Sequence, residues 1–397
     1  MERNKVSVLL VSVDALKPEF VFEQERLGIS LPNISKYFVE NGTFAGGGVQ
    51  SVFPTFTYPC HQSIITGTNP ATHGIYNNGI FDPMGEHMGA WHWFASKKVE
   101  NLWEAAGKHG YLSASVAFPT SVAAGGDFIA PEFWWDGTEL DSRFIDAMSV
   151  PQGMILEMEK DIGRYAGGLD LTEAGDRQRY RAAMWVLDHK IAPRTKERPF
   201  FMSAYFASFD EMAHQYGVYS KEAAHAIEAI DRMLGDLVEK VHSMTDDRAV
   251  VCVVSDHGTL DNRYNIRPNV KLREAGLITT DGNGRVTDWR AWSQRAGGMS
   301  EIRLKNGQDE DAGKRLDAWL AEQTELTRSA VQKLMEEGRV TAAGKPLAKN
   351  TRLTGGETVS VALPEPEAVD IVPQNIPLDV VYEDEDVIVV NKPKGLV

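Results

Sequence analysis

Four short runs of the chain are almost continuously apolar, and they lie far apart in the sequence. They cover residues 6–13, a stretch near 112–117, and residues 200–206 and 249–254. A strand that is buried on both faces has this composition, whereas a strand with one solvated face alternates apolar and polar residues. The four runs therefore predict strands of a mainly parallel sheet.

Two segments between these runs show helical spacing instead. Residues 100–110 read ENLWEAAGKHG, and residues 222–242 read EAAHAIEAIDRMLGDLVEKVH. The second segment carries one apolar stripe, formed by Ile227, Ile230, Leu234, Leu237 and Val241. Such a stripe is typical of an amphipathic helix that packs on a core. Strands that alternate with helices in this way predict a doubly wound α/β fold.

Acidic residues and histidines follow three of the predicted strands. The first run ends on Asp14, the third precedes Asp210 and His214, and the fourth leads into Asp256 and His257. An Asp after a strand is often a helix cap, and an Asp and a His one helical turn apart can be a solvated pair. In open α/β sheets, however, ligands bind at the carboxyl ends of the strands. Together the five side chains predict a site for two divalent cations.

The stretch SVFPTFTYPCHQSIITGTNPATHGIYNN, residues 51–78, places a threonine on a turn before a helical segment. Thr57 stands at the start of that segment, where a phosphate group would also meet backbone amides. A coordinated cation would stabilise the alkoxide of its hydroxyl, which is a poor nucleophile at neutral pH. Thr55 is the rival hydroxyl, and His61 is expected to brace the turn. This combination indicates phosphoryl-transfer chemistry.

The motif FPTFTYPCHQSIITGTNPATHGIYNN, with VSVDA before it and DEMAH and SDHG after it, resembles the type I phosphodiesterase/nucleotide pyrophosphatase family of the alkaline phosphatase superfamily. The resemblance covers residues 5–298. It implies a sheet of the alkaline phosphatase type and hydrolysis of phosphodiester or pyrophosphate bonds in nucleotide-type substrates, through a phosphothreonine on Thr57. It also implies two divalent cations, most simply zinc, bound by Asp14, Thr57, Asp210, His214, Asp256 and His257.

Two departures from the family pattern modify this expectation. Nucleotide pyrophosphatases proper carry an asparagine where this chain has Cys60, and a thiol is a weak donor to a phosphate oxygen. We therefore keep the substrate class broad, with Cys60 and Asn78 as candidate substrate-binding residues. The family's second metal also takes a downstream histidine, and the sequence has none after His257. This predicts a weak second metal site and reduced activity.

The character of the sequence changes at Met299. The stretch MSEIRLKNGQDEDAGKRLDAWLAEQTELTRSAVQKLMEEGRVTAAGKPL resembles the amino terminus of a ribosomal large-subunit pseudouridine synthase. GKRLDAWLAEQ and TRSAVQKLMEEGRV match the two helices of its ribosomal-protein-S-four-like module. That resemblance implies a small α+β module that binds structured RNA through Lys314, Arg315, Arg328, Lys333 and Arg339.

The two resemblances predict three consecutive parts in the chain. Residues 1–298 form a carboxy-terminally incomplete catalytic domain, and residues 299–363 form the RNA-binding module. Residues 364–397 contain a linker, EPEAVDIVPQNIP, and the first strands of a truncated synthase catalytic domain, as a short extended tail. The motif that holds the synthase's catalytic aspartate is absent, so pseudouridine formation is not expected.

Charge and cysteine usage agree with this division. The net charge is −15, and residues 1–298 carry 29 basic and 38 acidic side chains, which argues against broad adhesion to nucleic acid there. Residues 302–352 carry a net charge of +2, so RNA would bind in that segment. Two cysteines exclude a disulfide framework and favour a reducing, cytoplasmic location; no signal peptide or membrane span is expected.

Three alternative functions follow from the same residues. A sulfatase of the superfamily needs Cys-x-Pro-x-Arg, and Cys60 is followed by His61, Gln62, Ser63 and Ile64, so that alternative fails. A phosphomonoesterase remains open, because residue spacing does not reveal the preference between monoesters and diesters. A catalytically weak protein that retains only RNA binding through residues 299–363 is the third possibility.

Overall fold

Two compact units make up the chain, Met1–Glu310 and Asp311–Val397. The computed structural model describes residues 5–135, 140–168, 170–262, 264–306, 314–342, 344–353, 358–363, 379–383, 385 and 388–391. Each unit has a hydrophobic core of its own.

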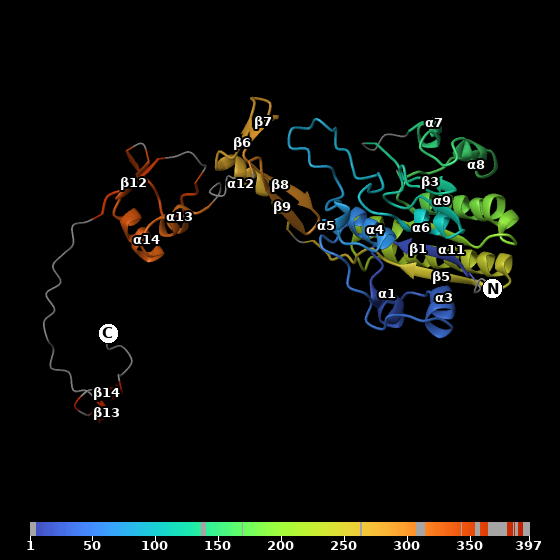
Figure 1. Cartoon of the computed structure of the whole chain (residues 1–397), viewed down its shortest axis with the longest axis horizontal. Helices are drawn as coiled ribbons and strands as arrows, with labels where there is room; N and C mark the ends of the chain where they lie inside the picture. Colours follow the sequence, from blue (N-terminus) through green and yellow to red (C-terminus); the bar gives the residue numbers. More distant parts are fainter. Residues whose placement is uncertain are drawn as a thin grey trace. The chain divides into compact units, whose positions relative to one another are not determined.

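The first unit is built on a parallel sheet of five strands in the order β3-β2-β4-β1-β5 (Figure 1). These strands are β1 (Ser7–Val13), β2 (Leu112–Val116), β3 (Phe128–Ala130), β4 (Phe200–Phe206) and β5 (Ala249–Val254). Four of them confirm the predicted strands to within one residue at each end. Strand β3 was not predicted from the sequence, because three residues are too few to show a periodic pattern.

Helices cover both faces of this sheet, as predicted for a doubly wound fold. One core joins apolar residues of β1, β2 and β4 to α8, α9 and α11, and a second joins β1 and β4 to α4 and α6. The helices of the unit are α1 (Pro18–Phe22), α2 (Gln24–Leu27), α3 (Pro32–Ile34), α4 (Thr57–Thr66), α5 (Pro70–His73), α6 (Leu102–Lys108), α7 (Ser142–Asp146), α8 (Met154–Ile162), α9 (Glu173–Val186), α10 (Ser208–Tyr216), α11 (Lys221–Thr245) and α12 (Pro268–Glu274). Short π and 3-10 turns extend α3 and α9, at Ser35–Glu40, Leu187–Ile191 and Ala192–Arg194.

The longest helix, α11, confirms the predicted amphipathic segment. Its side-chain cap is Ser220, which accepts a hydrogen bond from the amide of Ala223. All five residues of the predicted stripe are fully buried against the sheet. The other predicted helix is α6, where Asn101 and Glu104 form a capping box. Within the part of the chain that the structure describes, every helix is too short or too polar to cross a lipid bilayer.

A β-hairpin crosses Met299, the predicted junction between the two resemblances. Strand β8 (Ala291–Ala296) pairs antiparallel with β9 (Met299–Leu304), with Ala296 opposite Met299. The turn between them is the pair Gly297-Gly298, and Gly297 has a φ of 55°. Tight two-residue hairpin turns require such positive φ values, which glycine adopts freely. A second hairpin, β6 (Ile278–Thr280) with β7 (Val286–Trp289), precedes it.

The second unit contains the two helices that the sequence predicts there, α13 (Leu316–Gln323) and α14 (Arg328–Glu336). They pack on a small sheet of β10 (Val340–Ala342), β11 (Lys345–Pro346) and β12 (Val359–Val361). The strand order in this sheet is β11-β10-β12. Farther on, β13 (Asp379–Glu383) pairs with β14 (Ile388–Asn391). The predicted linker at residues 365–377 lies outside the described residues.

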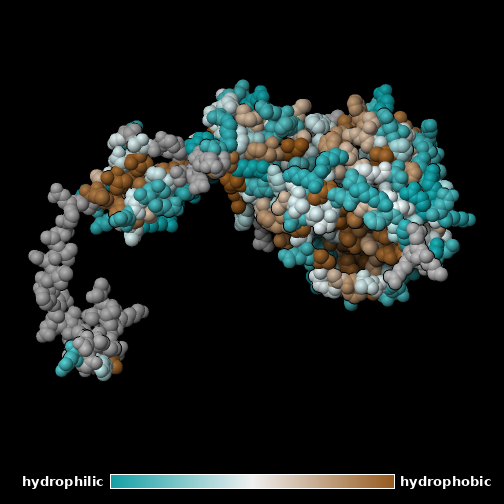
Figure 2. All heavy atoms as spheres, viewed as in Figure 1, coloured by the Kyte–Doolittle hydropathy of each residue, from teal (hydrophilic) through white to brown (hydrophobic). Residues whose placement is uncertain are grey.

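Strand β5 forms one edge of the central sheet, and its sequence AVVCVV carries no charge. In the described parts of the chain it pairs with β1 alone, and Val250 is 48% exposed. Figure 2 shows apolar residues gathered in the region of the first unit where Figure 1 places β5. An apolar edge with unpaired backbone groups is a template for association with another chain.

We therefore predict that Val250→Lys raises the soluble yield of the full chain, because a lysine on an edge strand opposes strand pairing. The measurement is light scattering together with the soluble fraction after expression. Leu156→Lys adds the same charge at a residue of similar exposure on α8 and should change little. Equal improvement from both substitutions would show that net charge, rather than the β5 edge, controls solubility.

Candidate functional site

The predicted site residues lie together at the carboxyl ends of the strands of the central sheet. Asp14 directly follows β1, and Asp256 lies two residues beyond the end of β5. Strand β4 leads through Ala207 into α10, which carries Asp210 and His214. Because the three strands are parallel and adjacent, their carboxyl ends place these side chains together.

Thr57 is the first residue of α4, and its side chain points toward the residues that follow the central strands. Its Oγ1 lies 3.3 Å from Nε2 of His257. Thr55 is exposed, and its hydroxyl donates instead to the carbonyl of Val52 at 2.9 Å. The structure thus brings Thr57, and not Thr55, beside the predicted metal ligands.

The helix start offers fewer free amides than the sequence suggests. The amide of Tyr58 donates to Oδ1 of Asn78 at 2.9 Å, and Pro59 has no amide hydrogen. The amide of Cys60 donates to the carbonyl of Phe56. The expectation that a phosphate group would meet several free backbone amides at the start of α4 is therefore wrong. Of the amides in this first turn, that of Thr57 remains as a possible donor to a phosphate. Asn78 holds the turn that carries Thr57.

Asp14, Asp256 and His257 form a compact cluster of possible metal ligands. Their ligand atoms lie within 4.8 Å of one another, and this is the sole set of three such residues in the described parts of the chain. Nε2 of His257 lies 3.5 Å from Oδ1 of Asp14 and 3.2 Å from Oδ2 of Asp256. Both aspartates are buried.

The electrostatics of this cluster fit a bound cation. Oδ1 of Asp14 and Oδ2 of Asp256 are buried, and within the described structure neither has a hydrogen-bond partner. Burial, followed by the charges of Asp256 and Asp210, holds the pKa of Asp14 well above its usual range. Burial and the charge of Asp210 raise the pKa of Asp256 to about 7. Buried carboxylate oxygens without a hydrogen-bond donor are normally neutralised by protonation of the group or by a metal ion.

The second predicted ligand pair lies on one face of α10. Oδ2 of Asp210 is 3.3 Å from Nε2 of His214, and Oδ1 of Asp210 is buried without a hydrogen-bond partner among the described residues. The hydrogen bond to Asp210 raises the pKa of His214 to about 9. Asp261, a conceivable substitute for the missing histidine, accepts the amide of Val218 at 3.0 Å, just beyond α10. It does not join a three-ligand cluster in the described structure.

Two residues behind the cluster fix its orientation. The hydroxyl of Tyr205, on β4, donates to Oδ2 of Asp14 at 2.5 Å. His61 lies 2.7 Å from the carbonyl of Thr57 through Nδ1 and 2.9 Å from the hydroxyl of Ser12 through Nε2. Burial lowers the pKa of His61 to about 3, so the ring is neutral and donates from Nδ1. His61 therefore braces the turn, as expected, while Tyr205 was missed because a tyrosine within an apolar strand resembles a core residue.

Cys60 is buried within α4, three residues after Thr57. Its Sγ lies 3.1 Å from Oγ of Ser51, and burial raises the pKa of the thiol to about 12, so the thiol stays protonated. In this arrangement the sulfur faces Ser51 within the protein. A role for Cys60 and Asn78 in binding substrate remains a prediction.

Most of the predicted RNA-binding residues form ion pairs with acidic side chains of the same unit. The shortest nitrogen-to-oxygen distances are 2.9 Å for Lys314–Glu322, 2.9 Å for Arg315–Asp317, 3.0 Å for Arg328–Asp317 and 3.0 Å for Arg339–Glu337. Lys333 is exposed, and no ion pair to it is present among the described residues. The positive potential of this segment is therefore smaller than its lysine and arginine content suggests.

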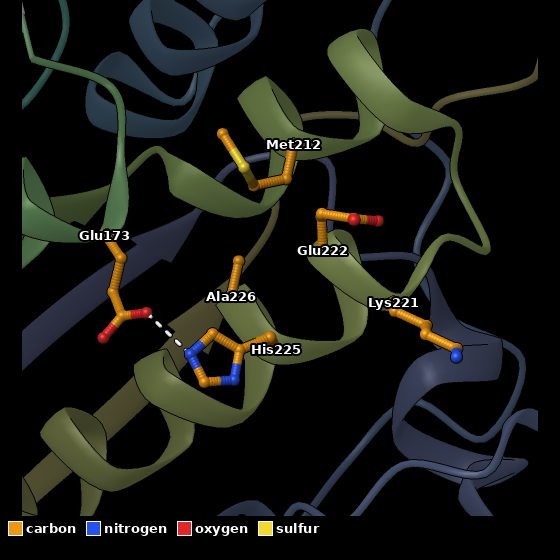
Figure 3. Close-up of a pocket in the computed structure, with 6 residues that line it drawn as sticks. All are labelled: Glu173, Met212, Lys221, Glu222, His225 and Ala226. Atoms are coloured by element: carbon orange, nitrogen blue, oxygen red, sulfur yellow. Dashed lines mark ion pairs between the residues drawn. The ribbon is translucent and has the colours of Figure 1, made fainter.

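A hollow of about 270 Å³ lies between α9, α10 and α11, and none of the residues that line it is a predicted site residue (Figure 3). Its lining is Glu173, Met212, Lys221, Glu222, His225 and Ala226. Glu173 and His225 form an ion pair across it at 3.0 Å. The predicted metal ligands therefore do not belong to the lining of this hollow.

Comparisons with known proteins identify two sources of similarity. A family model described as type I phosphodiesterase / nucleotide pyrophosphatase matches residues 8–353. Human ectonucleotide pyrophosphatase/phosphodiesterase family member 1 is 28% identical over 259 residues, which are 63% of this chain and 23% of that protein. An uncharacterised RNA pseudouridine synthase of Synechocystis sp. is 53% identical over 87 residues, 21% of this chain and 27% of that protein. The chain therefore spans about a quarter of the length of each of these relatives.

A solved structure also resembles the chain. Murine ectonucleotide pyrophosphatase/phosphodiesterase 5, in an inactive form in complex with AMP, aligns with a TM-score of 0.49 and 16% identity over 90% of this chain and 79% of that one. The family match and the two relatives agree with both predicted resemblances. The family model also extends past Met299, the predicted junction.

The raised pKa values predict a pH dependence for the metal-free protein. A carboxyl group whose pKa is raised on folding stabilises the fold below its unfolded pKa, and this contribution is lost as pH rises from the unfolded to the folded pKa, so that for Asp256 it is gone above about pH 7. His214 has its pKa raised from 6.5 to about 9, so its contribution is lost between these two values. We therefore expect the melting temperature to fall between pH 6.5 and pH 8.5, mainly through His214, by at most about 2–4 °C for each kcal/mol lost.

The buried histidines do not obscure this window. Their pKa values are lowered, to about 3 for His61 and about 4 for His73, so they cost stability only below pH 6.5. Thermal unfolding after chelation, repeated with His214→Gln, is the measurement. The variant should lose most of the pH slope. An unchanged slope in His214→Gln would contradict the raised pKa of this imidazole.

Proposed function

Because the chain belongs to the type I phosphodiesterase / nucleotide pyrophosphatase family, we propose that it hydrolyses phosphodiester or pyrophosphate bonds of nucleotide-type substrates, with Thr57 as the nucleophile. One observation carries the proposal: the Thr57 hydroxyl lies 3.3 Å from His257 within a cluster of buried, unsatisfied carboxylates. The similarity to a human ectonucleotide pyrophosphatase/phosphodiesterase supports the substrate class.

The unsatisfied oxygens support two divalent cations, most simply zinc. Asp14, Asp256 and His257 would hold one with Thr57, and Asp210 and His214 would contribute to the other. Such ions lower the pKa of a bound hydroxyl and neutralise charge on phosphate oxygens. The second set has two protein ligands, short of the three usual for catalytic zinc, so we propose that it binds its ion weakly and that activity is reduced.

The protein's own residues position the attacking hydroxyl. Asn78 and His61 anchor the backbone of the turn through the amide of Tyr58 and the carbonyl of Thr57. Oγ1 of Thr57 would form a bond to phosphorus while the bond to the leaving oxygen breaks, and the departing group takes up a proton. Water would then cleave the phosphothreonine, restoring the hydroxyl and releasing the phosphorylated product.

We predict that Thr57→Ala removes hydrolysis of bis-p-nitrophenyl phosphate while the protein stays folded, because among the described residues its hydroxyl is the one that contacts Nε2 of His257. Thr55→Ala is the matched control and should retain most of the activity, since the Thr55 hydroxyl donates to Val52. Equal losses from both variants would remove Thr57 from this role.

The same assay decides between the two substrate classes. Rates on p-nitrophenyl phosphate and on bis-p-nitrophenyl phosphate distinguish a phosphomonoesterase from a phosphodiesterase. Faster hydrolysis of the monoester that also depends on Thr57 would favour the phosphomonoesterase alternative.

RNA binding by the second unit is a second candidate function. The similarity to pseudouridine synthases favours it, whereas the ion pairs of Arg315, Arg328 and Arg339 weaken it. We propose weak, salt-sensitive binding of structured RNA and no pseudouridine formation. A cytoplasmic location likewise stays a proposal, supported by the two free cysteines.

For this second function we predict that Lys333→Ala weakens RNA retention by the full chain and lowers the salt dependence by about one unit of slope, as loss of one phosphate contact would. Lys271→Ala, on α12, removes an exposed lysine from the first unit and should leave retention unchanged. Binding titrations at several salt concentrations are the measurement. Identical salt slopes for the wild type and Lys333→Ala would argue against this residue as a phosphate contact.

A further inference from the structure

A buried ion pair on α9 lies behind both groups of proposed metal ligands. Asp176 and Arg179 are 0% and 1% exposed, and Nη1 of Arg179 donates to Oδ1 of Asp176 at 3.0 Å. We infer that this pair is a positioning device that sets the geometry of Asp210 and His214 through Asp176, and of Asp14 through Arg179. The inference rests on the proposed metal site and adds residues that do not themselves contact metal or substrate.

Asp176 caps the helix that carries one ligand group. Its carboxylate accepts the amides of Ala207 at 3.0 Å and Ser208 at 2.8 Å, at the start of α10. The N-cap residue of α10 is Ala207, whose side chain cannot supply a cap. A carboxylate also interacts favourably with the positive end of the helix dipole. The direction in which α10 leaves β4 therefore depends on a residue of α9.

The ligands on α10 lie close to this cap. Asp210 is the third residue of the helix, and His214 follows one turn later. A small rotation of the first turn would move Oδ1 of Asp210, the buried oxygen without a partner, relative to the Asp14 cluster. Loss of the cap should thus change metal binding before it unfolds the domain.

Arg179 connects the same pair to the other ligand group. Its guanidinium carbon lies 6.0 Å from the ring centroid of Tyr205. The hydroxyl of that tyrosine donates to Oδ2 of Asp14. Arg179 thus lies at cation–π distance from the ring whose hydroxyl holds Oδ2 of Asp14, and Oδ1 of Asp14 is left as the oxygen available to a cation.

The pair is a costly way to stabilise a core. Burying two charges carries a desolvation penalty that apolar side chains of similar volume avoid. Nε and Nη2 of Arg179 are buried and have no hydrogen-bond partner among the described residues, so the arginine is only partly compensated. Its position beside Tyr205 is better explained by orientation of the site than by stability.

The test compares Asp176→Asn with Asp231→Asn in the full chain. Asparagine keeps the shape of the side chain but has one acceptor oxygen, so it cannot satisfy both amides of α10. Asp231 is the matched control: it is buried on α11 and accepts the amides of Asn33 and Ile34 at the start of α3, away from the site. Both variants should lose stability.

Only Asp176→Asn should weaken zinc binding, by about 10- to 100-fold, as loss of a group that orients metal ligands typically does. Zinc affinity is measured by competition with a chelator, and hydrogen exchange of residues 207–216 is measured in the metal-free protein. Exchange should quicken in Asp176→Asn and stay unchanged in Asp231→Asn. Similar zinc affinity and exchange in the two variants would overturn the inference.

A second variant covers the case in which Asp176→Asn does not fold. Arg179→Met leaves the carboxylate cap in place and removes the contact with Tyr205, so zinc affinity should fall while exchange of residues 207–216 is retained. Unchanged zinc affinity in Arg179→Met would overturn the role of Arg179. If the wild-type chain binds no zinc, the proposed function fails, whereas the exchange measurement still decides whether Asp176 positions α10.

Discussion

Repulsion among buried carboxylates is the constraint on which the site depends. Asp14, Asp210 and Asp256 are brought together because β1, β4 and β5 are adjacent and parallel, and each has a buried oxygen without a hydrogen-bond partner in the described structure. The charge of Asp210 raises the pKa of both other carboxyl groups. The imidazoles of His214 and His257 and the hydroxyl of Tyr205 lie against these carboxylates and partly offset their negative charge. A divalent cation is the partner that removes the repulsion without protonating the ligands.

The positions of the proposed ligands could be predicted from sequence, because they follow from the order and composition of the strands. Uninterrupted apolar runs are typical of parallel strands, and polar residues that follow them lie at one edge of the sheet. Asp176, Arg179 and Tyr205 could not be predicted in this way. Each lies within a helix or strand where charge and aromatic residues have many structural explanations, and their role depends on contacts between α9, β4 and α10 that no local pattern encodes.

The hairpin across Met299 shows a second limit of sequence reasoning. Similarity to two protein families places a junction there, yet backbone pairing depends on turn geometry and alternation rather than on the origin of a segment. Gly297-Gly298 permits the tight turn, and the strand after it packs on the first unit: the guanidinium of Arg303 lies 4.6 Å from the ring centroid of Tyr76 and 4.8 Å from that of Phe81. The compact unit accordingly extends to Glu310.

The two charge clusters of the chain differ in a way that composition cannot reveal. In the second unit, Asp317 is buried and accepts from both Arg315 and Arg328, which hold its pKa well below its usual range. Opposite charges there satisfy one another, and the arginines join α13 to α14. At the carboxyl ends of the central strands, like charges lie together, and one oxygen of each aspartate has no hydrogen-bond partner in the described structure. Internal pairing indicates a structural role for charge, whereas a buried oxygen without a partner is typical of a ligand. This difference supports the proposal that the chemistry belongs to the first unit.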